Sequence, residues 1–134
     1  MTRTLTISAA LALVALFVLL SGCGGERDVP ADAVRAAIAD TIHARGDTLV
    51  LADSRSGKPL VVRFDHVHET VDPTPGGRYV ACVDYMGPDG TVYDVDYYLG
   101  DREGTFQLED VVLHKVDDEN VIPEAERARL DSQP

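Results

Sequence analysis

Apolar and polar residues recur with two different periods along this chain. In the first region the apolar and small residues are three or four positions apart, as on one face of a helix. These residues are Val34, Ala37, Ile38, Thr41 and Ile42. Pro30 suits the first position of a helix, and Gly46 stands where a helix would end. The pattern therefore predicts one amphipathic helix over residues 30–45.

Beyond Gly46, apolar and polar residues alternate with a period of two, which is typical of strands with one buried face. The predicted strands cover residues 48–51, 60–71, 78–86, 91–99 and 105–116. Proline and glycine at 72–77 predict a loop. The polar residues 118–134 predict a C-terminal tail with at most a short surface helix. A helix followed by antiparallel strands must cover one face of their sheet, so the pattern indicates an α+β fold.

The most informative local signal is the turn Gly87-Pro88-Asp89-Gly90. Pro88 and Asp89 suit the corners of a type I turn, and Gly90 can adopt the left-handed conformation that closes a three-residue hairpin loop. With this loop, apolar residues pair on one face: Tyr85 with Tyr93, Val83 with Val95, Ala81 with Tyr97 and Tyr79 with Leu99. A slip of one residue would mix the two faces, so the pattern predicts this register.

The other face of the same hairpin is acidic. The register places Asp84 opposite Asp94 and Cys82 opposite Asp96. Directly opposed like charges destabilise a strand pair, so a cation, a basic side chain or water should compensate for them. The basic side chains on the neighbouring strands are Arg63, His66, His68, Arg78 and His114.

Two arrangements of the strand before the hairpin lead to different interpretations. If His66 aligns with Asp84 and His68 with Cys82, imidazole, thiolate and carboxylate groups share a face and could bind a divalent transition metal. The candidate metal ligands are then His66, His68, Asp84 and Asp94, with Cys82, Asp96 and His114 as further candidates. However, the apolar residues Leu60, Val62 and Phe64 have the same parity as both histidines. This apolar stripe favours the second arrangement, in which the histidines lie in or beside the core.

Composition narrows the class of partner. The chain has 134 residues, with 23 acidic and 12 basic side chains and a net charge of −11, which disfavours nucleic acid and anionic lipid headgroups. Catalysis would need a proton shared by Asp84 and Asp94, or a thiolate–imidazole pair of Cys82 and His114. No stretch of the chain matches a catalytic or cofactor motif, so we expect a protein that is not an enzyme.

The N-terminal residues have the pattern of an export signal. Arg3 precedes an apolar segment at 7–20, which as a helix would rise about 21 Å, short of the hydrocarbon layer of about 30 Å. The sequence Leu20-Ser21-Gly22-Cys23 resembles the lipobox of bacterial lipoproteins, in which a small residue precedes the cysteine that receives lipid. The resemblance implies cleavage before Cys23, a thioether-linked diacylglycerol on its sulfur and an amide-linked acyl chain such as palmitate. More than one chain makes such an anchor stable.

The expected organisation has four parts: a signal peptide at 1–22, a lipidated tether at 23–29, a domain at 30–117 and a polar tail at 118–134. The order of elements in the domain resembles cystatin-like α+β folds. That resemblance implies one N-terminal amphipathic helix packed on a four- to five-stranded antiparallel meander sheet.

The lipoprotein resemblance implies a protein held at the cell envelope by its lipid. Because Gly24 and not aspartate follows Cys23, it implies the outer membrane in a Gram-negative host. We expect a non-catalytic domain that binds an envelope protein or a small ligand and needs no cofactor besides its covalent lipid. The alternative is a lipoprotein that binds a divalent metal on the acidic and histidine-bearing face of its sheet.

Overall fold

The computed structural model describes residues 28–52 and 56–134. In chain order the elements are α1 (Ala31–Ala44), β1 (Thr48–Ala52), β2 (Pro59–Val67), β3 (Asp72–Pro73), β4 (Tyr79–Met86), β5 (Val92–Arg102), β6 (Thr105–Val116), β7 (Glu119–Asn120) and α2 (Glu124–Asp131). The predicted export signal and Cys23 lie outside the described residues. Within the described ranges, no helix is both long and apolar enough to cross a membrane.

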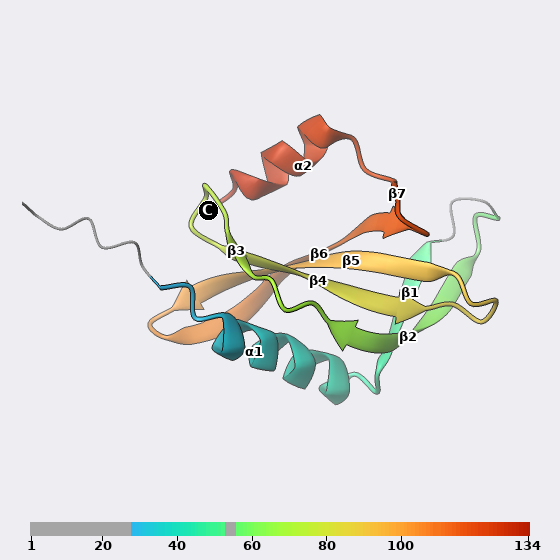
Figure 1. Ribbon diagram of the computed structural model, residues 1–134, viewed down its shortest axis with the longest axis horizontal. Coiled ribbons are helices and arrows are strands. Elements are labelled where there is room, and N and C mark those ends of the chain that lie inside the picture. The colour runs from blue at the N-terminus through green and yellow to red at the C-terminus, as the bar shows by residue number, and fades with distance from the viewer. Residues whose placement is uncertain (1–27, 53–55) are drawn as a thin grey trace, which may run out of the picture.

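The strands form one antiparallel sheet, which is strongly curved (Figure 1). The strand order is β1-β2-β4-β5-β6-β7, and the short strand β3 pairs with β4 beside this path. Helix α1 lies on one side of the sheet and α2 on the other (Figure 1). We call the side that faces α1 the inner face and the side that faces α2 the outer face.

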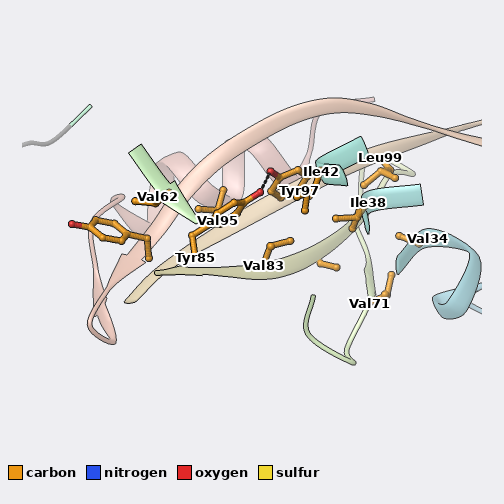
Figure 2. Packing of buried hydrophobic residues seen from close by; sticks show 12 residues of the cluster. Val34, Ile38, Ile42, Val62, Val71, Val83, Tyr85, Val95, Tyr97 and Leu99 are labelled. Carbon is orange, nitrogen blue, oxygen red and sulfur yellow. Dashed lines mark hydrogen bonds between the residues drawn. The ribbon is translucent and has the colours of Figure 1, made fainter. Parts of the chain in front are cut away.

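The inner face and α1 enclose the main apolar core (Figure 2). The helix predicted from the sequence is confirmed, and its buried residues Val34, Ile38 and Ile42 recur every four positions. The hydroxyl groups of Tyr85 and Tyr97 form a buried hydrogen bond of 2.5 Å. Burial raises the pKa of both phenols, so both remain neutral partners in this bond.

A smaller apolar cluster lies on the outer face, where Leu130 of α2 packs against Tyr98 of β5. Arg78 is only 3% exposed and donates hydrogen bonds to Asp110 at 2.6 Å and to the backbone carbonyl of Leu130. Its guanidinium also lies 4.6 Å from the centre of the Tyr98 ring. The Tyr98 hydroxyl donates to Asp131 at 2.8 Å. These contacts fix α2 against the sheet.

The predicted fold class is wrong. We expected one N-terminal helix on a four- to five-stranded cystatin-like meander, followed by a polar tail at 118–134. The chain is instead mostly β, with a curved seven-stranded sheet and a short helix that follows it. Residues 118–134 hold β7 and α2, which are part of the fold. A sheet covered by one helix would expose alternate residues of its central strand, whereas residues 93–100 of β5 are all buried.

The predicted hairpin of β4 and β5 is confirmed. The Gly87 amide donates to the Thr91 carbonyl at 2.8 Å, and Gly90 has a φ of 86°. The four predicted apolar pairs are formed on the inner face. The two polar pairs predicted for the other face, Asp84 with Asp94 and Cys82 with Asp96, are formed on the outer face.

Candidate functional site

A β-bulge in β2 decides which way His66 in this strand and His68 directly after it point. Pairing with β4 is regular up to Phe64, but the next pair joins His66 to Asp84, so Asp65 is an extra residue. A bulge changes the alternation of the side chains beyond it. Phe64 therefore contacts the core, whereas His66 and His68 face the outer side with Asp84. The expectation that the apolar stripe would carry the histidines into the core is wrong for this reason.

His66, His68 and Asp84 form a group that we call the outer triad. The Nε2 atom of His68 lies 3.0 Å from Oδ1 of Asp84, and Nε2 of His66 lies 3.9 Å from Oδ2 of the same carboxylate. The two imidazole rings are stacked, with 5.2 Å between their centres. One donor atom from each residue lies within 4.8 Å of the other two, which is close enough for a single ion to contact all three. The side chains of His66 and Asp84 are 57% and 21% exposed, so the group opens to solvent.

The extra residue of the bulge orients one of these ligands. Oδ2 of Asp65 lies 2.8 Å from Nδ1 of His66. A hydrogen bond from Nδ1 leaves Nε2, the nitrogen nearer Asp84, with a free lone pair. A carboxylate behind an imidazole in this way fixes the ring and increases its basicity in metal sites. Asp65 is therefore a positioning residue for the outer triad.

Four further residues form a deeper group on the outer face, which we call the buried tetrad: Cys82 of β4, Asp94 and Asp96 of β5, and His114 of β6. One donor atom from each lies within 4.8 Å of the others. Asp96 is fully buried, and Asp94 and His114 are nearly so. The pairing of β5 with β6 skips His114, because Asp94 pairs with Lys115 and the next residue of β5 pairs with Leu113. Irregularities in both β2 and β6 thus bring ligand residues to the outer face.

The thiol of Cys82 donates a hydrogen bond to Oδ1 of Asp96 at 3.0 Å. Burial, followed by the nearby carboxylates of Asp96 and Asp94, raises the pKa of this thiol. The group is therefore a protonated thiol in the metal-free protein. Its proton is directed to a carboxylate and not to His114, so the thiolate–imidazole pair considered from the sequence is not formed.

Arg127 of α2 completes the surroundings of the tetrad, and it was missed in the sequence. Its NH1 atom lies 2.5 Å from Nε2 of His114, and its NH2 atom lies 3.3 Å from Oδ2 of Asp96. A guanidinium can only donate hydrogen bonds, so the ring nitrogen accepts. The Nε2 atom of His114 therefore presents its lone pair to Arg127, and a nitrogen with a lone pair is what a metal ion needs. The sequence shows that the polar C-terminal segment contains Arg127, but it does not show that α2 docks on the sheet and brings this side chain to Asp96 and His114.

The candidate ligands predicted from the sequence fall into two groups. His66, His68 and Asp84 come together as proposed, whereas Asp94 does not join them. Although Asp94 is the register partner of Asp84, its carboxylate lies with the further candidates Cys82, Asp96 and His114. The outer face thus carries two clusters of metal-ligating side chains.

Comparison with known protein families, with curated proteins and with solved structures found no match for this chain.

Proposed function

We propose that this chain is a lipid-anchored protein of the cell envelope that binds a divalent transition metal at the outer triad. The observation that carries the proposal is that His66 of β2, His68 just after this strand and Asp84 of β4 converge on one point. Two imidazoles and one carboxylate are donors suited to zinc and copper. Calcium is a poor match because it takes six or more oxygen ligands.

The exposure of the triad favours reversible binding. Closed structural zinc sites are surrounded by four protein ligands, whereas sites with three keep a position open for water or another ligand. In the outer triad the His66 side chain is 57% exposed, so an ion bound there would keep a coordination position open to solvent. A metal held in this way can be captured from solution and passed to another molecule, which suits a protein fixed to a membrane surface.

The test is isothermal titration of the full chain with Zn²⁺, Cu²⁺ and Ca²⁺ in mild detergent. The chain carries Cys23→Ala, so that no thiol outside the domain contributes. We expect heat of binding with Zn²⁺ or Cu²⁺, and a loss of affinity of at least about tenfold for the triad site in the variant His66→Ala/His68→Ala. The titration with Ca²⁺ should give no comparable heat.

His43→Ala is the matched control. His43 has the same exposed fraction as His66, 57%, and also has a carboxylate neighbour, Asp47, at 2.5 Å. It lies at the end of α1, outside the triad, so its removal should leave the titration unchanged. Equal affinities in the parent chain and in the double histidine variant would contradict the proposed site.

The anchor is tested separately from the metal. In a bacterial host the mature protein should begin at Cys23, carry acyl chains and sediment with membranes. The variant Cys23→Ala should lose the acyl mass and remain uncleaved. A mature product that begins at another residue and carries no acyl group would contradict the lipoprotein part of the proposal.

A second candidate function is the binding of an envelope protein along β1. This strand is at the edge of the sheet, and its residue Val50 pairs with Val61 of β2. These two valines are 62% and 55% exposed, which is unusual for adjacent large apolar side chains. Crosslinking in intact membranes should yield a protein adduct that the variant Val50→Lys loses. An adduct pattern unaffected by this variant would exclude β1 as the binding edge.

A further inference from the structure

The buried tetrad contains carboxylate oxygens that accept no hydrogen bond from the described residues. Oδ1 of Asp94 and Oδ2 of Asp96 are buried and accept no hydrogen bond within the described part of the chain. Arg127 approaches the second of these atoms at 3.3 Å without the geometry of a hydrogen bond. Buried carboxylate oxygens are costly unless hydrogen-bonded, paired or bound to a metal. Both unsatisfied oxygens belong to residues whose carboxylates converge on Cys82 and His114.

The charges of the group are also unbalanced. Two carboxylates lie beside one guanidinium, and Nδ1 of His114 also lies 3.3 Å from Oδ1 of Asp96. Lys115 is the register partner of Asp94 but forms no ion pair with it in the described chain. A divalent cation would place a positive charge between these carboxylates, and the proton of the Cys82 thiol would leave to solvent.

We propose that Cys82, Asp94, Asp96 and His114 form a second, buried site for a divalent transition metal of intermediate softness such as Zn²⁺ or Co²⁺. Four side-chain donors are the number that closed tetrahedral sites use, and thiolate and imidazole are the donors that such ions prefer. This site uses no residue of the outer triad, so the inference does not rest on the function proposed above. On binding, the metal–sulfur bond forms as the S–H bond of Cys82 breaks, and one proton is released.

A small pocket lies beside this site. The pocket has a volume of about 50 Å³ and is lined by residues that include His68, Cys82 and Arg127. It therefore joins a ligand of the outer triad to a ligand of the tetrad and to the helix that covers it.

The test uses Co²⁺ alone as the probe and the full chain in mild detergent with the substitutions Cys23→Ala, His66→Ala and His68→Ala. These changes leave Cys82 as the sole thiol and remove the outer triad. We expect one equivalent of Co²⁺ to produce a thiolate-to-metal charge-transfer absorption band, with release of one proton. The variant Asp94→Asn, which keeps the size of the side chain, should bind at least about 100-fold more weakly. The variant Cys82→Ser should lose the band.

Asp40→Asn is the control for net charge, because Asp40 is an exposed residue of α1 on the opposite side of the sheet. It should leave the titration unchanged. Far-ultraviolet circular dichroism of each metal-free variant verifies that it is folded. Absence of the band in the folded parent would overturn the proposal, and so would an affinity that Asp94→Asn does not alter. If only the outer triad binds metal, Zn²⁺ should give heat in the chain with intact histidines, while Co²⁺ should give no thiolate band in any chain. This result would also overturn the proposal.

Discussion

The two faces of β5 are equally buried but differ in chemistry. Its inner residues Tyr93, Val95 and Tyr97 belong to the apolar core beneath α1. Its outer residues alternate with them, and of these Asp94 and Asp96 are buried carboxylates, the second of which lies 3.3 Å from Arg127 of α2. Burial alone therefore does not indicate what a side chain contributes. The inner face gains free energy by removing apolar surface from water, whereas the outer face places charged groups where their desolvation is costly.

This difference implies that the inner face stabilises the fold, whereas the outer face is suited to another role. An apolar core is sufficient to stabilise a domain of this size, so buried carboxylates are not needed for folding. A buried ion pair replaced by apolar residues often leaves stability unchanged or increased. The charged residues of the outer face are then better explained by a ligand than by stability, and substitutions on the two faces should have different effects.

The largest effect on stability should come from the inner face. Ile38→Ala removes a fully buried side chain at the centre of the contact between α1 and the sheet, and it should lower the free energy of unfolding by about 3 kcal/mol. Urea denaturation of the metal-free chain measures this loss. The fraction that remains folded should bind Zn²⁺ as the parent does. A loss of stability below about 1 kcal/mol would show that α1 adds little to the core.

An intermediate effect should follow from separating α2 from the sheet. The Gly76 amide donates to the Asp131 carbonyl at 3.0 Å, and a Cβ atom at Gly76 would overlap with the backbone of Gln133. Gly76→Ala should therefore cost about 2 kcal/mol and expose the amides of α2 to hydrogen exchange while those of α1 stay protected. Pro75→Ala in the same loop is the control. Uniform loss of protection in both helices would mean that the two faces unfold together.

The smallest effect on stability should come from the buried charge itself. Asp96→Asn keeps an acceptor for the Cys82 thiol and leaves Arg127, which is partly exposed, able to regain hydration. The metal-free variant should differ from the parent by less than about 1 kcal/mol, because the cost of burying the carboxylate offsets its attraction to Arg127. Thermal and urea unfolding measure this difference. Destabilisation comparable to that of Ile38→Ala would assign the outer face to folding and remove the contrast between the faces.

The features predictable from the sequence were those set by neighbouring residues. The turn at Gly87-Pro88-Asp89-Gly90 determines the register of β4 and β5, and the spacing of Val34, Ile38 and Ile42 determines the buried face of α1. Both signals act within a few residues. They were sufficient to place Asp84 opposite Asp94 before any tertiary contact was known.

The features that could not be predicted depend on distant contacts. Nothing in the alternation around Asp65 reveals a bulge, because the apolar residues before it and the histidines after it each keep a period of two. Helix α2 has one buried residue, Leu130, and its docking relies on Arg78 and Tyr98, which lie far away in the chain. The burial of the outer face under α2 was therefore not predicted, and the candidate ligands could not be divided into the two clusters that the structure shows.

The bulge at Asp65 makes the proposed metal site a matter of strand register as well as of residue identity. If Asp65 paired with Asp84 in an unbulged strand, both imidazoles would turn to the inner face, although every histidine and aspartate of the triad would still be encoded. Deleting Asp65 would instead keep His66 opposite Asp84 in regular pairing and remove only the carboxylate behind its Nδ1 atom. Related sequences that lack this one residue should therefore keep the three ligand side chains together on the outer face.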